Sequence, residues 1–127
     1  MPSLDPSTGV IIVDHGSVRA ESNETLEELV DRFRLRHKGG NIEPAHMELA
    51  EPSIATAFER CVEQGAKHII VIPYFLGPGK HWKHDIPNLT REAADRHDGV
   101  SFQVGEPIGL HPMMLDVVDA RLNDALD

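Results

Sequence analysis

The sequence contains very little cysteine and no long hydrophobic run. Because Cys61 is the only cysteine among the 127 residues, an internal disulfide is impossible, which agrees with a reducing compartment. No apolar run approaches the length that spans a bilayer, so we expect no membrane role. Residues 1–9 lack the basic and long apolar parts of a secretory signal, and we therefore expect a cytoplasmic location.

Positive charge is also scarce. Lys and Arg number 12 against 21 Asp and Glu, so the formal net charge is −9 at pH 7. The sequence has no basic stripe, and a nucleic acid would be repelled rather than attracted. The hydrophobic fraction of 40% and the length suit one compact core, and we expect residues 1–127 to form a single domain. Histidine, by contrast, is abundant, with eight in the chain.

Four segments have the pattern of strands. Residues 10–13 and 69–72 are wholly apolar and rich in β-branched side chains, which is typical of strands buried on both faces of a parallel sheet. A weaker strand is predicted at about 42–49, where Pro44 indicates an edge position or a late start. A fourth strand is predicted at 100–104.

Helical periodicity separates these strands. The expected helices run from Ser22 or Asn23 to Gly39, from Pro52 to Gly65, from about 85 to 97, and onward from Pro112. Their apolar stripes are Leu26, Leu29, Val30 and Phe33, then Ile54, Phe58, Cys61 and Val62, then Leu89, Ala93 and Ala94, and finally Leu115, Val118 and Leu122. Strands alternating with helices predict a three-layer α/β fold with a mostly parallel four-stranded sheet.

Three potential metal ligands follow three of the predicted strands. His15 comes directly after the first strand, Glu48 closes the second, and His81 lies in the loop after the third. In a sheet of order 2-1-3-4, the crevice at the carboxyl ends of the strands lies where the order reverses, so these residues could meet there. Two imidazoles and a carboxylate suit Fe(II), Co(II), Ni(II) or Zn(II) and leave coordination positions open. Spacing alone does not separate this site from chance proximity among eight histidines.

Three ordered motifs carry a family resemblance. The first is His15-Gly16-Ser17 after a strand, the second is MELAEPSI at 47–54, and the third contains PYFL, GKH and DIP within 73–87. Together they resemble the short, single-domain sirohydrochlorin chelatases, the class II chelatases of the sirohaem and cobalamin pathways. The match extends from Gly9 to about Pro112. One departure is local, because members often carry Arg after the first motif, whereas this chain has Val18 followed by Arg19.

The resemblance implies an enzyme that inserts a divalent metal ion into sirohydrochlorin or a related tetrapyrrole. The metal substrate would be Co2+ or Fe2+, with Ni2+ as a further option, and no prosthetic group is expected. His15 matches the family's metal ligand and proton acceptor, His81 its second metal ligand, and Glu48 an acidic residue of the metal site. Expected substrate contacts are Glu51, the loop Leu76, Gly77, Pro78, Gly79 and Lys80, and the cation Arg19. A homodimer is also implied.

Other interpretations remain open at this point. A non-catalytic metal-binding or tetrapyrrole-carrying module could keep the same fold and site without turnover. A third interpretation is an anion-binding domain that uses Gly16 and Ser17, but the sequence there lacks the glycine-rich fingerprint of a phosphate-binding loop. His46 could support the metal site or could be a satisfied buried histidine.

Overall fold

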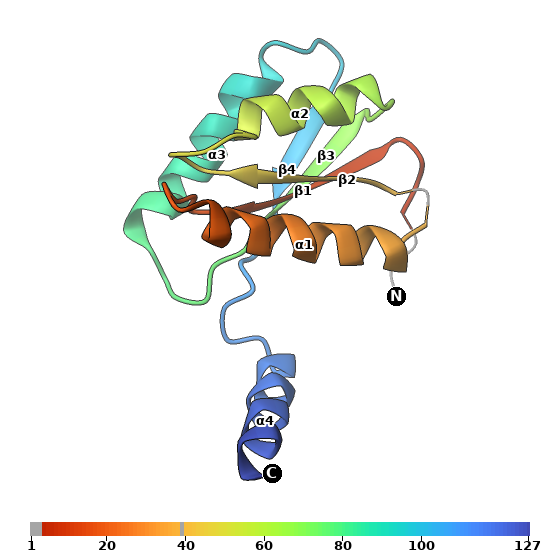
Figure 1. Ribbon diagram of the computed structural model, residues 1–127. Coiled ribbons are helices and arrows are strands. Elements are labelled where there is room, and N and C mark those ends of the chain that lie inside the picture. Colours follow the sequence, from red (N-terminus) through yellow and green to blue (C-terminus); the bar gives the residue numbers. More distant parts are fainter. Residues whose placement is uncertain (1–3, 39) are drawn as a thin grey trace.

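Figure 1 shows a computed structural model of the chain, which describes residues 4–38 and 40–127, apart from the side chains of Lys80 and His81. Strands and helices alternate along the chain. They are β1 (Thr8–Asp14), α1 (Ala20–Arg36), β2 (Asn41–His46), α2 (Ile54–Glu63), β3 (His68–Pro73), α3 (Lys80–Ala94), β4 (Ser101–Val104) and α4 (Met113–Leu126). The predicted α/β class is therefore confirmed.

The sheet is parallel throughout, and its strand order β2-β1-β3-β4 is the order expected from the sequence. Val13 of β1 lies between Ala45 of β2 and Pro73 of β3. β2 is an edge strand, as Pro44 indicated. Because the order reverses between β1 and β3, their carboxyl ends flank the edge where a ligand crevice can form.

Helices cover the two faces of the sheet and make three layers (Figure 1). α1 lies on one face, where Leu26 and Val30 pack with Val10 and Ile12. α2 and α3 lie on the other face, where the core includes Ile11, Val13, Phe58, Ile69 and Ile86. Neighbouring strand residues point to opposite faces, which is why a wholly apolar strand supplies both cores.

α1 and α2 both begin elsewhere than predicted. α1 starts at Ala20, before Asn23, because the Asn23 amide is used by the preceding loop: it accepts from the Ser17 N–H (3.0 Å) and donates to the Ser17 carbonyl (2.8 Å). α2 starts at Ile54, two residues after Pro52. Ser53 is its N-cap, since its hydroxyl accepts from the Thr56 N–H (3.2 Å).

The predicted start of α3 is wrong by about one turn. The helix begins at Lys80, so Lys80 and His81 belong to its first turn and not to the loop after β3. Pro87 lies inside the helix, although proline favours a helix start. Trp82 and Ile86, one turn apart, both pack on the core, and this tertiary contact keeps the segment before Pro87 helical.

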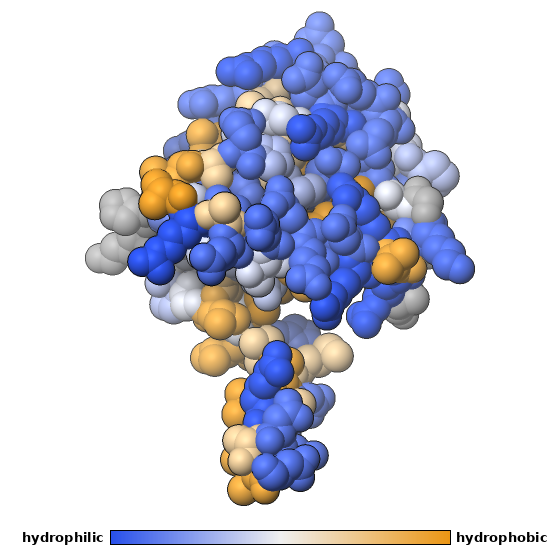
Figure 2. Space-filling view, in the orientation of Figure 1, coloured by the Kyte–Doolittle hydropathy of each residue, from blue (hydrophilic) through white to orange (hydrophobic). Residues whose placement is uncertain are grey.

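α4 begins directly after Pro112, as predicted, but it extends away from the sheet (Figure 1). Its apolar stripe is not covered by the described residues, because Leu115, Val118 and Leu122 remain 70%, 63% and 55% exposed. Figure 2 shows apolar side chains along one side of this helix and polar ones along the other. Within the described residues, no helix combines the length and apolar character needed to cross a membrane.

Candidate metal and tetrapyrrole site

The backbone brings His15 and Glu48 together at the carboxyl edge of the sheet. β2 ends at His46, two residues before Glu48, so the prediction that Glu48 closes the strand is wrong in detail. The chain nevertheless stays beside β1, because the Met47 N–H donates to the Asp14 carbonyl (2.8 Å) and the Glu48 N–H to the His15 carbonyl (3.1 Å). His15 Nε2 then lies 3.2 Å from Glu48 Oε1.

Gly16 makes this close approach possible. Its φ is +91°, a backbone conformation that side-chain-bearing residues rarely adopt. A Cβ at this position would also collide with the Glu48 carbonyl oxygen. The glycine therefore allows the loop after β1 to lie against the loop after β2.

The imidazole of His15 is suited to binding a cation together with Glu48. His15 Nδ1 lies 3.2 Å from the Gly16 carbonyl, so a proton on Nδ1 can be donated to that oxygen. Nε2 then presents its lone pair beside the carboxylate, and a nitrogen and an oxygen 3.2 Å apart can both bind one metal ion at about 2 Å. Both side chains are more than half exposed, which leaves them open to solvent and substrate.

His46 supports the end of β1 from inside the protein. It is fully buried, and its Nδ1 lies 2.6 Å from Asp14 Oδ1, on the residue that precedes His15. Its Nε2 has no hydrogen-bond partner among the described residues. Of the two roles considered for His46, the structure shows a buried histidine bonded to the strand that carries His15.

The side chains of Lys80 and His81 lie outside the described residues, so the meeting of His81 with His15 stays a prediction. Within the described part of the chain, no group of three or more His, Cys, Asp or Glu residues could hold a metal ion. The described site therefore consists of the His15 and Glu48 pair.

Glu48 also lines a polar hollow between the loop after β2 and α3. The hollow has a volume of about 460 Å3 and includes the acidic residues Asp85 and Glu92. Negative charge from three carboxylates in one hollow favours the approach of a dication. The part of the site beside Glu48 is therefore acidic.

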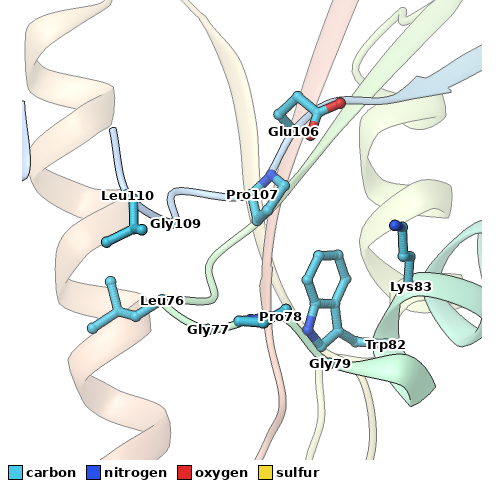
Figure 3. A pocket seen from close by; sticks show the side chains of 10 residues that line it. All are labelled: Leu76, Gly77, Pro78, Gly79, Trp82, Lys83, Glu106, Pro107, Gly109 and Leu110. Atoms are coloured by element: carbon cyan, nitrogen blue, oxygen red, sulfur yellow. The ribbon is translucent and has the colours of Figure 1, made fainter. Parts of the chain in front are cut away.

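A larger, mainly apolar cavity of about 560 Å3 opens at the ends of β3 and β4 (Figure 3). Its walls are Leu76, Gly77, Pro78, Gly79, Trp82, Lys83, Glu106, Pro107, Gly109 and Leu110. Trp82 stacks on Phe75 with ring centroids 5.0 Å apart and planes 7° apart. The loops are joined because the Ile108 N–H donates to the Pro73 carbonyl (3.2 Å) and the Gly109 N–H to the Phe75 carbonyl (2.9 Å).

The sequence predicted one wall of this cavity and missed the others. Leu76 to Gly79 were expected as substrate contacts, whereas Trp82 and Glu106 were not assigned to a binding site. The signal in the sequence that could have identified these residues is that they follow β3 and β4, whose carboxyl ends form this edge of the sheet. His15 and Glu48 are not among the residues that line the cavity, so the candidate metal ligands and the cavity occupy different parts of the same edge.

Two further predicted residues have local roles in the structure. Glu51 Oε1 accepts hydrogen bonds from the Thr56 hydroxyl (2.8 Å) and the Ser53 N–H (3.1 Å), and these bonds lower the pKa of Glu51. Its carboxylate thus helps to begin α2. Arg19 is exposed at the N-cap of α1, beside the exposed Val18.

Comparison with known sequences gives a consistent set of relatives. The profile of the CbiX family matches residues 9–125. The chain is 53% identical over 123 residues to the chloroplastic sirohydrochlorin ferrochelatase of Arabidopsis thaliana, covering 97% of this chain and 55% of that protein. It is 33% identical over 122 residues to the sirohydrochlorin cobaltochelatase of Sulfolobus acidocaldarius, covering 93% of this chain and 92% of that protein. The chain spans about half the length of several relatives, including the Arabidopsis protein.

Solved structures show the same fold. SirB from Bacillus subtilis with Fe3+ superimposes with a TM-score of 0.85 at 33% identity, covering 94% of this chain and 47% of that chain. A protein from Marinobacter aquaeolei VT8, described as a CbiX protein of cobalamin biosynthesis, gives a TM-score of 0.81 at 33% identity and covers 94% and 97% of the two chains.

Proposed function

The chain belongs to the CbiX family, and from this premise we propose that it inserts a divalent metal ion into sirohydrochlorin or a related tetrapyrrole. The observation that carries the proposal is the pairing of His15 Nε2 with Glu48 Oε1, 3.2 Å apart, at the edge that also holds the apolar cavity. Relatives named as sirohydrochlorin ferrochelatases and cobaltochelatases support iron or cobalt as the metal substrate. Nickel stays a further candidate on the chemistry of the ligands.

The metal binds first, in this proposal, to His15 and Glu48, with His81 as a second imidazole on the strength of the family resemblance. An imidazole and a carboxylate hold Co2+ or Fe2+ without filling its coordination sphere, so the ion can still accept ring nitrogens. The acidic hollow beside Glu48 raises the local concentration of dications. The metal is a substrate, and the proposed reaction requires no prosthetic group.

Metal insertion also requires a base, because two pyrrole N–H protons must leave the ring. Histidine titrates near neutral pH, and a bound dication keeps its imidazole unprotonated. His15 therefore binds the metal first and accepts a proton after the metal has moved to the ring. Glu48, within hydrogen-bond distance of Nε2 and exposed to solvent, can pass that proton on to water, which leaves His15 free to accept the second ring proton.

The tetrapyrrole binds, we propose, against the apolar cavity, where the Trp82 ring, stacked on Phe75, forms a flat aromatic wall. A planar macrocycle can bury its face there, while its carboxylates meet Lys83 and the proposed contacts Lys80 and Arg19. Glu51 and the loop from Leu76 to Gly79 complete the proposed substrate contacts. We further propose that residues 1–127 act as one chelatase-like domain, as a homodimer in the cytoplasm.

An absorbance assay with sirohydrochlorin and Co2+ or Fe2+ tests this proposal. We expect the wild-type protein to exceed the uncatalysed rate, His15→Ala to fall to that rate, and Glu48→Gln to weaken metal binding. His68→Ala is the matched control, because His68 lies at the opposite end of the sheet and bonds to Ser101 and Gln103.

The same assay distinguishes the alternative functions. A wild-type protein that binds metal or tetrapyrrole but does not exceed the uncatalysed rate would be a carrier, and the enzymatic proposal would be wrong. Equal activity of His15→Ala and wild type would remove His15 from the mechanism.

A further inference from the structure

Asp14 and His46 are the last paired residues of β1 and β2, two strands that lie side by side (Figure 1). Each comes just before a segment that carries a proposed metal ligand, since His15 follows Asp14 and Glu48 is two residues after His46. Their side chains are joined, because His46 Nδ1 donates to Asp14 Oδ1 over 2.6 Å. A side-chain bond thus connects the two strands at the point where both ligand segments begin.

The fold alone gives little reason for a polar pair at this position. Alternation along the strands places both residues on the face covered by α1, where Val10, Ile12 and Ile42 are apolar. His46 is fully buried and its Nε2 lacks a hydrogen-bond partner among the described residues, while the Asp14 side chain is 20% exposed. Burial of an unpaired polar atom costs folding free energy, which an apolar side chain of similar volume would avoid. A cost of this kind beside a candidate site points to a function other than packing.

His46 also contacts the loop that carries His15. A Cβ built at Gly16 would lie 3.1 Å from the His46 Cβ, so Gly16 packs directly against His46. On its other side, the His46 N–H donates to the Pro52 carbonyl (2.8 Å), and this bond closes the segment that contains Glu48. A displacement of His46 would therefore move both ligand segments at once.

We propose that Asp14 and His46 form a positioning pair, which fixes the separation and orientation of His15 and Glu48 for metal binding. The proposal rests on the proposed function of those two ligands. Backbone bonds from the Met47 N–H to the Asp14 carbonyl and from the Glu48 N–H to the His15 carbonyl fix the spacing of the main chains. The side-chain bond in addition limits rotation of each strand end, and such rotation would turn the His15 ring away from Glu48.

The proposed metal site depends on this support because its two described ligands are more than half exposed. A nitrogen and an oxygen 3.2 Å apart hold an ion together only while both stay within about 0.5 Å of that arrangement. Replacing residues that support metal ligands typically weakens metal binding about 10- to 100-fold. Asp14 and His46 act through the main chain and not through a bond to either ligand, so we expect the lower end of this range.

Titration of the full chain with Co2+ tests the pair, with the visible absorption of bound Co2+ as the readout. We expect His46→Leu to lower Co2+ affinity about tenfold and to change the spectrum at saturation, because the ligand geometry changes. His46→Asn can still donate to Asp14 from its amide, so it should recover most of the affinity. Asp14→Ala should match His46→Leu, and the double variant should lose no more than either single variant.

His97→Leu is the matched control. His97 also packs on the core, stacked on Phe58 with ring centroids 5.6 Å apart, but it lies before β4, at the opposite end of the sheet from His15. This variant should unfold at a lower urea concentration without a change in Co2+ affinity or spectrum. Wild-type affinity and spectrum in His46→Leu, or equal losses in His97→Leu and His46→Leu, would overturn the proposal.

The remaining variants keep the test decisive if His46→Leu does not fold. Asp14→Ala must then lose affinity while His46→Asn retains it, and the opposite result would overturn the proposal. A chelatase assay on the same samples separates the pair from the proposed function. A wild type that binds Co2+ as expected but does not exceed the uncatalysed rate would remove the enzymatic function and leave the positioning pair supported. An active wild type with unchanged affinity in both Asp14→Ala and His46→Leu would remove the pair alone.

Discussion

Among single residues, Gly16 has the clearest effect on the geometry of the site. It combines a positive φ with direct contact between the loops after β1 and β2. His15 and Glu48 lie on these two loops, so their 3.2 Å separation depends on a position that has no side chain. A residue without a side chain thus determines where the two proposed metal ligands meet.

We predict that Gly16→Ala weakens both folding and metal binding. The added Cβ meets the Glu48 carbonyl, so we expect the free energy of unfolding to fall by more than about 3 kcal/mol and Co2+ affinity to fall with it. Gly65→Ala is the control, because Gly65 also has a positive φ (+104°) but open space around its Cβ position. It should cost only about 1–2 kcal/mol. Urea denaturation and metal titration measure both effects, and equal losses in the two variants would contradict the proposed contact.

Lys83 and Glu106 provide a second test, because they bring opposite charges to the same cavity. If the substrate is a polycarboxylate, Lys83→Gln should raise its KM several-fold, whereas Glu106→Gln should lower it. Steady-state kinetics at fixed metal concentration measures both values. Changes of the same sign in the two variants would argue against substrate carboxylates at this cavity.

Among the helices, α2 shows how a site loop and a helix start can share residues. Ser53 caps the helix with its hydroxyl, and Glu51 accepts from the Ser53 N–H and the Thr56 hydroxyl. These bonds favour the ionised carboxylate and lower the pKa of Glu51 below its usual 4.5. The segment that follows Glu48 is therefore held in place by the first turn of α2.

The pH dependence of stability tests this arrangement. Because the folded-state pKa of Glu51 is lowered, ionised Glu51 contributes fully to the stability of the fold above about pH 4.5. This contribution is lost as the pH falls through the lower pKa of the folded state. We predict that Glu51→Gln is less stable than wild type at pH 7 and that this difference shrinks below pH 4.5. Glu59→Gln, an exposed change on the same helix, is the control. Denaturation curves in which wild type and Glu51→Gln differ in stability by the same amount at every pH would contradict this prediction.

The sequence predicted the order of the elements better than their ends and contacts. Wholly apolar, β-branched runs identified β1 and β3, because these strands supply both cores. It misplaced the start of α3, since Pro87 is a local start signal whereas the packing of Ile86 is a tertiary contact. It found the helical stripe of α4 but could not show that the stripe lacks a partner among the described residues.

Part of the candidate site was predictable from the sequence, and part was not. The rule for ligand crevices in parallel sheets brought His15 and Glu48 to one edge, and they lie there in contact. The far wall of the cavity, at residues 106–110, depends on backbone bonds from Ile108 and Gly109 to the end of β3. Such pairing between distant loops leaves no periodic signal in the sequence.

For the whole molecule, net charge affects the two proposed substrates in opposite ways. A protein of charge −9 attracts a dication and repels a polycarboxylate tetrapyrrole at long range. Within the site, the acidic hollow beside Glu48 strengthens the first effect, and the apolar cavity with Lys83 offsets the second. Recognition of the macrocycle must therefore depend on short-range contacts.

Ionic strength separates these effects, because the screening length falls from about 30 Å at 0.01 M salt to about 10 Å at 0.1 M. Over this range we predict that the KM for the tetrapyrrole falls while the KM for Co2+ rises. A variant with Glu63→Gln, Asp95→Asn and Asp98→Asn is the control, since these exposed acids lie at the other end of the sheet from His15. Removing three negative charges there should weaken both trends and leave kcat unchanged. If salt moved both constants in the same direction, the opposite responses of the two substrates could not arise from the net charge, and local contacts alone would govern binding.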